Sequence, residues 1–224
     1  MKQENQISES KRLAFLLAMS GGLMDAYTYI YRGQVFANAQ TGNILLFGVN
    51  LSVGNFKKAL QYFLPVFFFA VGIILAEVIR HFCLEKNTFH WRQFTVLAEC
   101  VILFFVGFVS KKHNLIANSF VSFACGIQVE SFRKVRGNAF ATTMCIGNLR
   151  SGTQALCDFF FQKDFTYLKK GMTYYGVIFA FTIGAILGNI LITIFATKAI
   201  WCSCILLLMG FLLMFIQEEK EQLA

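Results

Sequence analysis

Four acidic side chains lie inside apolar stretches of the sequence, where a charged group is expensive to bury: Asp25, Glu77, Glu99 and Glu130. A carboxylate at the centre of a membrane costs about 2.5–3.5 kcal/mol on insertion scales, so such residues face the protein interior or a water-filled cavity. Asp25 stands about twelve residues into its apolar run, which corresponds to roughly 18 Å of helix. This depth predicts a proton or cation carrier, or an anchor for a cationic substrate. The alternative is a carboxylate that caps backbone amides freed at Gly21 and Gly22.

Two of the other acids have basic neighbours that offer a simpler explanation. Arg133 and Lys134 follow Glu130 closely, so Glu130 is either a binding residue or one half of an ion pair at the membrane surface. Glu77 has Arg80 three residues further on, a spacing that brings side chains together on one face of a helix. Both glutamates therefore remain candidate binding residues with a structural alternative.

Two Gly-Asn pairs, Gly42-Asn43 and Gly147-Asn148, fall in the two weakest apolar stretches. Glycine permits the backbone to break, and asparagine can cap a helix or coordinate a ligand. Short, interrupted segments in corresponding halves of a membrane protein point to a transporter binding site. Together with Gly21 and Gly22 these glycines are the expected backbone breaks, and a plain kink or helix cap is the alternative. Arg150, close to Asn148, is predicted to bind a substrate anion or to pair with Asp158.

No familiar catalytic or metal-binding pattern accompanies these residues. The seven cysteines form no C-x-x-C pair, and the three histidines have no metal-ligand spacing. Neither a zincin motif nor a nucleophile-elbow motif is present. We therefore predict no enzyme activity, no cofactor and no metal.

The composition places these residues in a membrane. Of the 224 residues, 57% are hydrophobic and only 14% are charged, against about a quarter charged in soluble domains. The net charge of +8 comes from short basic clusters between apolar runs, which is typical of cytoplasmic flanks of membrane spans. We expect contact with lipid and not with nucleic acid.

Six stretches are long enough to cross a bilayer as helices, and the first is expected to be retained instead of cleaved as a signal peptide. They lie near residues 13–31, 59–80, 93–110, 114–132, 172–196 and 199–217. The stretches 35–54 and 139–161, which hold the Gly-Asn pairs, are poorer candidates and are expected to be broken or re-entrant.

The chain also contains an apparent internal repeat, with equivalent residues at a nearly constant offset. The offset is 105 residues for Gly21 and Gly126, 104 for Arg32 and Arg136, 105 for Asn43 and Asn148, and 112 for Gly72 and Gly184. This alignment makes Glu130 the partner of Asp25 and Asn189 the partner of Glu77. Small residues four apart, Gly72 with Ala76 and Gly184 with Gly188, predict close helix packing. The expected organisation is a tail of residues 1–12, repeats at 13–112 and 113–217, and a tail of residues 218–224.

The positive-inside rule favours six crossings over eight. Six crossings put 14 Lys and Arg residues on the cytoplasmic side and 6 outside, with both termini cytoplasmic. Three crossings in each repeat would invert the second copy, as in many secondary transporters.

The run Gly22-Leu23-Met24-Asp25-Ala26, with Val35-Phe36 and Thr41-Gly42-Asn43 after it, resembles the YoaK-type bacterial membrane proteins, a family of unknown function. The resemblance covers nearly the whole chain and implies a bacterial inner-membrane protein of about six helices. It supplies no substrate and no catalytic residue.

Taken together, the sequence predicts an all-α integral membrane protein with about six transmembrane helices in two inverted repeats. Its predicted function is that of a small secondary transporter or facilitator for an unidentified small solute, with proton coupling as one form. The alternative is a scaffold or sensor that transports nothing, and a homodimer is left open.

Overall fold

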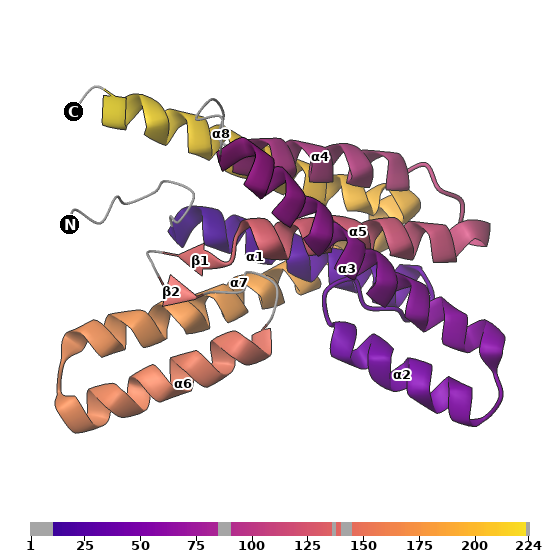
Figure 1. Ribbon diagram of the computed structural model, residues 1–224, viewed down its shortest axis with the longest axis horizontal. Helices are drawn as coiled ribbons and strands as arrows, with labels where there is room; N and C mark the ends of the chain where they lie inside the picture. Colours follow the sequence, from indigo (N-terminus) through magenta and orange to yellow (C-terminus); the bar gives the residue numbers. More distant parts are fainter. Residues whose placement is uncertain (1–10, 85–90, 136–137, 140–144, 223–224) are drawn as a thin grey trace.

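The computed structural model describes residues 11–84, 91–135, 138–139 and 145–222, and almost all of this chain is helical (Figure 1). The α-helices are α1 (Lys11–Ala26), α2 (Gln40–Ser52), α3 (Phe56–Leu84), α4 (Trp91–Val106), α5 (Asn114–Ser131), α6 (Cys145–Gln162), α7 (Phe165–Phe195) and α8 (Trp201–Gln222). A π-helix, η2 (Tyr27–Tyr31), continues α1, and the short helices η3 (Lys111–His113) and η4 (Ala196–Ile200) precede α5 and α8. Two-residue strands, β1 (Lys134–Val135) and β2 (Asn138–Ala139), pair between α5 and α6.

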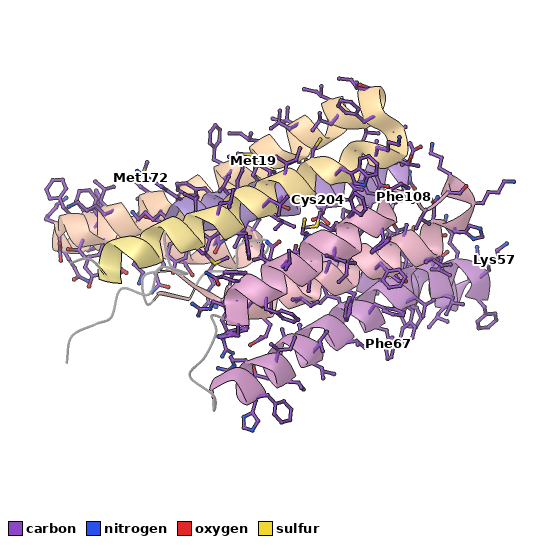
Figure 2. The ribbon with its side chains drawn as sticks, turned by 90° about the horizontal axis from the view of Figure 1, so that it is seen from above. Met19, Lys57, Phe67, Phe108, Met172 and Cys204 are labelled. Carbon is purple, nitrogen blue, oxygen red and sulfur yellow. The ribbon has the colours of Figure 1, made fainter. Side chains whose placement is uncertain are left out.

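Three segments of the described chain are long and apolar enough to cross a membrane: Lys11–Tyr31, Phe56–Phe82 and Phe165–Met214. The third covers α7, η4 and α8, so it is longer than one crossing needs. The helical membrane architecture expected from the sequence is thus confirmed in outline, and the six crossings stay a prediction. Phenylalanine side chains such as Phe67 and Phe108 project from the outer surface (Figure 2), where lipid rather than water would be their natural solvent.

The fold is held together by two pairs of crossing helices. The helix α1 packs against α7, and their backbones approach so closely that only glycine fits at the contact. A Cβ on Gly22 would overlap the carbonyl oxygen of Phe181, and one on Gly184 would overlap that of Met19. Close backbone approach through small residues is how membrane helices associate, because lipid gives them no hydrophobic drive toward one another.

The helices α3 and α5 cross in the same manner. A Cβ on Gly126 would overlap the carbonyl oxygen of Phe69, and one on Gly72 would overlap that of Phe123. On each long helix, the small residue four positions after the contacting glycine is also buried. It is Ala76 on α3 and Gly188 on α7. Both crossings therefore use glycines on both helices.

Two shorter helices lie beside the long ones. The helix α2 packs along the first half of α3, and α6 packs along the first half of α7 (Figure 1). The two hairpins, α2–α3 and α6–α7, extend toward opposite ends of the molecule; Lys57 and Met172, near the start of α3 and α7, mark these ends in Figure 2. At about 1.5 Å per residue, the 13 residues of α2 are too short to cross a hydrocarbon core of roughly 30 Å.

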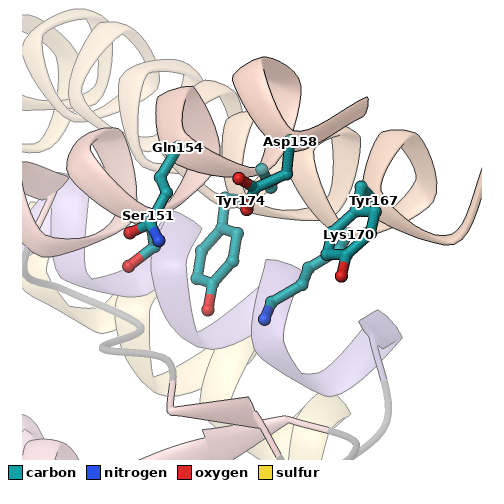
Figure 3. A pocket seen from close by; sticks show the side chains of 7 residues that line it. Ser151, Gln154, Asp158, Tyr167, Lys170 and Tyr174 are labelled. Carbon is teal, nitrogen blue, oxygen red and sulfur yellow. The ribbon is translucent and has the colours of Figure 1, made fainter. Parts of the chain in front are cut away.

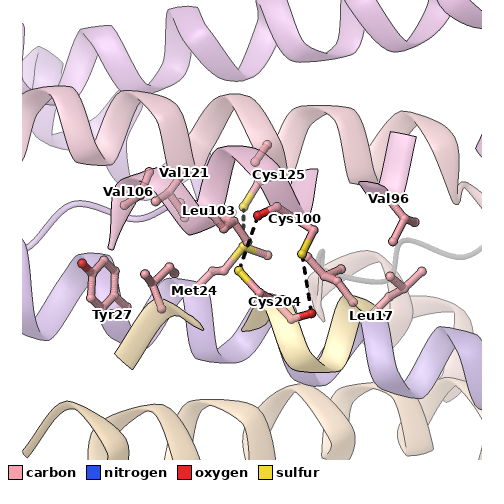
Figure 4. Close-up of a cluster of buried hydrophobic side chains, with 14 of the residues drawn as sticks. Leu17, Met24, Tyr27, Val96, Cys100, Leu103, Val106, Val121, Cys125 and Cys204 are labelled. Atoms are coloured by element: carbon pink, nitrogen blue, oxygen red, sulfur yellow. Dashed lines mark hydrogen bonds between the residues drawn. The ribbon is translucent and has the colours of Figure 1, made fainter. Parts of the chain in front are cut away.

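The main core lies where α1, α4, α5 and α8 meet, and it is lined by aliphatic and sulfur-containing side chains (Figure 4). Its centre contains Cys100 of α4 and Cys204 of α8. The Cys100 Sγ lies 3.8 Å from the Cys204 carbonyl oxygen, and the Cys204 Sγ lies 3.5 Å from the Cys100 carbonyl oxygen. Both cysteines are free thiols.

Candidate functional site

Asp25 holds the start of α2. Its carboxylate accepts a hydrogen bond of 2.8 Å from the Asn38 backbone amide, and the amides of Ala37 and Ala39 also donate to it. The Asn38 side chain donates to the Gly21 carbonyl oxygen over 3.2 Å, which ties the same turn to α1. A carboxylate beside the free amides of a helix N-terminus is favourably placed. The capping alternative is therefore supported, although the amides come from residues 37–39 and not from Gly21 and Gly22.

Asn43 is fully engaged in fixing the linker before α2. Its Oδ1 accepts from the Phe36 amide at 3.0 Å, and its Nδ2 donates to the Phe36 carbonyl oxygen at 2.7 Å and to Gln40 Oε1 at 2.8 Å. Asn148 is likewise buried in the first turn of α6. Asn43 in this arrangement has no free polar atom to offer a solute.

The four glycines expected to break the backbone lie inside helices. Gly21 and Gly22 belong to the unbroken α1, and Gly42 and Gly147 belong to the first turns of α2 and α6. In the first half, the interruption comes at residues 27–39, where η2 and an irregular linker carry the chain back to Asp25. In the second half, the stretch that precedes α6 lies outside the described residues.

Arg32 is the buried charge that the sequence analysis used only as a marker of the repeat. Its side chain is fully buried and donates to the Tyr27 hydroxyl at 2.6 Å and to the Val109 carbonyl oxygen at 2.7 Å. Further bonds reach the Ser110 carbonyl oxygen and Asn114 Oδ1. Its guanidinium thus caps the C-terminal end of α4, where carbonyl groups attract cations. Burial of this arginine is hard to predict because all its partners except Tyr27 lie 74–82 positions away in the sequence.

Glu99 is the buried acid whose partners are missing. Its side chain on α4 is completely buried, and neither carboxyl oxygen has a hydrogen-bond partner among the described residues. The Cys125 thiol on α5 lies within electrostatic reach of both Glu99 and Asp25 and contacts Met24 Sδ at 3.7 Å. Cys125, labelled in Figure 4, is thus the core residue that both acids influence.

Other buried polar atoms of the described chain also lack a partner. They include Ser20 Oγ on α1, Ser122 Oγ on α5 and Asn38 Oδ1. Buried polar groups in proteins are nearly always paired with protein or ordered water. Glu99 differs from these neutral groups because it is an acid with both oxygens unpaired among the described residues.

Glu77 and Glu130 belong to a cluster of ion pairs at one end of α3 and α5. Glu77 pairs with Arg80, Glu130 pairs with Arg133 at 2.9 Å, and the two carboxyl groups lie within hydrogen-bonding reach of one another. The ion-pair interpretation therefore describes both glutamates. Gly126 makes at the α3–α5 crossing the same kind of contact that Gly22 makes at the α1–α7 crossing.

A shallow polar pocket opens between α6 and α7, in a region that the sequence analysis did not treat as a site. Its volume is about 100 Å³, and Ser151, Gln154, Asp158, Tyr167, Lys170 and Tyr174 line it (Figure 3). Arg150 is exposed on α6 outside this pocket, and among the described residues it makes no ion pair with Asp158. The pocket was missed because its seven lining residues, Ala155 included, come from two helices and form no motif.

Comparison with protein families gives one match. Residues 13–213 match the model of a family described as a protein of unknown function (DUF1275). The chain belongs to this family. The match covers both halves of the chain and agrees with the family resemblance seen in the sequence. The comparisons with curated proteins and with solved structures give no match.

Within the described residues of this DUF1275 chain, no cluster of three or more His, Cys, Asp or Glu side chains is arranged to hold a metal ion. The family description names no activity, so the function must be argued from two places in the fold. These are the region around Glu99 and the pocket between α6 and α7.

Proposed function

We propose that this protein is a small proton-linked transporter of the inner membrane, built from two inverted repeats that rock against one another. Glu99 is the residue that takes up and releases the proton. The observation that carries this proposal is the complete burial of a carboxyl group with neither oxygen hydrogen-bonded among the described residues. Intramembrane acids of this kind mark ion and proton pathways.

The helix contacts support a duplication. In one crossing the contacts join Gly22 to Phe181 and Gly184 to Met19; in the other they join Gly126 to Phe69 and Gly72 to Phe123. Each residue of α1 has its equivalent on α5 at an offset of 104, and each residue of α7 has its equivalent on α3 at an offset of 112. Two contacts that correspond atom by atom are what a duplicated unit would produce.

The opposite directions of the two hairpins support the inversion. The α2–α3 and α6–α7 hairpins correspond in sequence and extend toward opposite ends of the molecule (Figure 1). On this basis we assign α2 and α6 as segments that enter the membrane from opposite sides, and the other six helices as crossings. The assignment of α6 rests on its correspondence to the 13-residue α2, because its own 18 residues are not short. Paired segments of this kind near the midplane are typical of secondary transporters.

Glu99 stands where a rocking motion would change its surroundings. It lies on α4 in the first repeat and packs against α5 and α8 of the second. A carboxyl group without hydrogen-bond partners is stable in the interior only with its proton bound, because a bare charge there costs several kcal/mol. Separation of the repeats would let water reach Glu99 and would permit release of that proton.

Asp25, which the sequence favoured as the proton carrier, has the opposite surroundings. Its carboxylate is satisfied by backbone amides at the start of α2. Hydrogen bonds from three consecutive amides hold the carboxyl group in one position, which suits an anchor. We assign Asp25 the role of anchoring the half-helix α2, and Glu99 the role of proton exchange.

The test uses purified protein in liposomes that contain a pH-sensitive dye. A mixture of small amino acids is added outside, and acidification of the lumen is recorded. Wild type is expected to acidify the lumen, Glu99→Gln to lose at least nine-tenths of the initial rate, and Glu77→Gln, an exposed acid outside the core, to retain it. Acidification by Glu99→Gln at the wild-type rate would overturn the role of Glu99. A wild type that moves no proton with any small solute would favour a scaffold or sensor.

A further inference from the structure

The pocket between α6 and α7 is built by close packing of two helices near the end of their hairpin. Gly152 of α6 lies against Tyr174 and Tyr175 of α7, since a Cβ at Gly152 would come within 3.0 Å of the Tyr174 Cβ. This contact fixes the spacing of the helices. The side chains of Gln154, Asp158 and Lys170 project beside it into the space seen in Figure 3.

Five polar residues of this pocket have no partner among the residues that the structure describes. Among the described residues, no side-chain hydrogen bond or ion pair is made by Ser151, Gln154, Asp158, Tyr167 or Lys170. An acid on α6 and a base on α7 would be expected to pair if they served only to join the two helices. Their separate placement leaves one anionic and one cationic group available to a bound molecule.

The corresponding surface of the α2–α3 hairpin lacks these groups. The residues equivalent to Ser151, Gln154 and Asp158 are Leu46, Val49 and Val53, at the offset of 105 that relates Asn43 to Asn148. The long helices, in contrast, keep a lysine and a buried tyrosine at equivalent places, Lys58 with Lys170 and Tyr62 with Tyr174. Polarity is therefore particular to α6, as expected for a site and not for a shared structural feature.

The charges and the size restrict the ligand. One carboxylate and one ammonium group balance each other, so the pocket is electrically complementary to a molecule that carries both charges. The tyrosine rings of Tyr167 and Tyr174 offer apolar faces and hydroxyl groups beside them. A volume of about 100 Å³ is well below the roughly 300–1,000 Å³ of pockets for drug-sized molecules, so the ligand has few non-hydrogen atoms.

The location indicates the side from which the ligand comes. The turn between α6 and α7 is rich in lysine, with Lys163, Lys169 and Lys170 close together, which is typical of the cytoplasmic side. Exposed phenylalanines, Phe160, Phe161 and Phe165, surround the same turn and suit the boundary of the lipid. The pocket would thus open to the cytoplasm at the level of the lipid headgroups.

We propose that this pocket binds a compact zwitterion, with a primary ammonium group directed to Asp158 and an oxyanion directed to Lys170. Two sources carry this chemistry, a free small amino acid and the headgroup of phosphatidylethanolamine. This inference rests on the proposed function in one respect: a free zwitterion bound here would be the solute that the protein transports. Binding does not require Glu99.

Binding is tested on purified full-length protein by titration calorimetry with glycine, with L-alanine and with phosphoethanolamine, and by retention on phosphatidylethanolamine-containing nanodiscs against phosphatidylglycerol nanodiscs. The variants are Asp158→Asn and Lys170→Gln, and the matched control is Lys169→Gln, an exposed lysine outside the pocket. We expect each pocket variant to weaken binding at least tenfold and the control to bind as wild type does.

The outcomes separate the sources and the two proposals. Binding of the free zwitterions identifies a solute site, and preference for phosphatidylethanolamine alone identifies a lipid site. Absence of both, or equal binding by wild type and both pocket variants, would overturn the inference. Glu99→Gln should bind the zwitterions as wild type does. A variant that binds normally but moves no proton therefore bears on the role of Glu99. A variant that moves protons normally but no longer binds bears only on the pocket.

Discussion

Cys100 and Cys204 contact each other reciprocally, with each thiol directed to the backbone carbonyl oxygen of the other at 3.8 Å and 3.5 Å. They are 104 residues apart, the same offset that relates Gly22 to Gly126. Two equivalent residues can exchange identical contacts only if they lie beside the two-fold axis that relates them. Under the proposed duplication, that axis passes between α4 and α8, and the neighbouring residues Glu99 and Ser203 become equivalent positions.

The glycines at the helix crossings should be intolerant of a single added carbon. Gly184→Ala and Gly72→Ala each place a Cβ on a backbone carbonyl oxygen of the facing helix, Met19 or Phe123, which has no side-chain freedom to move away. We expect each substitution to destabilise the protein by about 1–3 kcal/mol, measured as a lower midpoint of thermal unfolding in detergent.

Gly48→Ala on α2 is the matched control, because a Cβ there meets nothing within 4 Å. Alanine is the better helix former by about 1 kcal/mol, so this variant should be unchanged or slightly more stable. Equal effects of all three substitutions would contradict the close crossings.

Replacement of Asp25 should lower the stability of the protein more than it changes proton movement. Asp25→Asn retains one acceptor oxygen for the Asn38 amide, whereas Asp25→Leu retains none. Because a buried donor left without an acceptor costs about 1–3 kcal/mol, Asp25→Leu should unfold at a clearly lower temperature than Asp25→Asn. If Asp25 were the proton carrier, Asp25→Asn would fold normally and lose all pH-dependent uptake, and that result would restore the role that the sequence suggested.

Arg32 should not tolerate lysine. The guanidinium reaches Tyr27, Ser110, Val109 and Asn114 at once, and an ammonium group cannot reproduce this fork of donors. We expect Arg32→Lys to cost about 2–5 kcal/mol, as for other buried charged groups that lose partners. Arg150→Lys, an exposed arginine on α6, should have no measurable effect on the unfolding midpoint.

Much of the fold was predictable because it depends on local apolar runs. The stretches 13–31, 59–80 and 172–196 reappear within α1 with η2, within α3 and within α7, and Arg80 pairs with Glu77 as their spacing predicted. The Gly-Asn stretches lie in α2, the shortest α-helix of the described chain, and in the 18-residue α6, and their re-entrant character stays a prediction. Such features are set by hydropathy and by helical periodicity, which a single sequence contains.

The candidate site was less predictable because it depends on contacts between distant helices. Asp25 was recognised as unusual, but its partners are amides of residues 37–39, and amides carry no sequence signal. Glu99 was one of four intramembrane acids, and only the packing of α4 against α5 and α8 reveals that it alone lacks described partners. The pairing of Asp25 with Glu130 in the repeat stays a prediction, and the glycine contacts at the helix crossings offer a second register with an offset of 104.

The start of α7 should fray at low pH. Asp164 accepts a hydrogen bond of 2.8 Å from the Thr166 amide as the N-cap of α7, and this bond holds the pKa of the Asp164 carboxyl below its ordinary value of 3.8. The contribution of the cap is therefore complete above pH 3.8 and is lost as the pH falls through the lower, folded-state value. Hydrogen exchange at Thr166 should accelerate in that acid range in wild type, and it should be fast at neutral pH in Asp164→Ala. Asp164→Asn keeps an oxygen acceptor, so an acid-dependent change in that variant would contradict the role of Asp164.

The proposed topology places the two hairpin turns on opposite sides of the membrane. Lys57 begins α3 at one end of the molecule and Lys169 begins α7 at the other, near the ends marked in Figure 2. Cysteines introduced as Lys57→Cys and Lys169→Cys would be treated with a membrane-impermeant maleimide in intact cells and then in inverted vesicles, with wild type as the control for the natural thiols. Six crossings with cytoplasmic termini require Lys57→Cys to react in intact cells and Lys169→Cys to react in inverted vesicles. Reaction of both from the same side would mean that α2 and α6 cross the membrane completely, and it would remove the inversion on which the transport proposal depends.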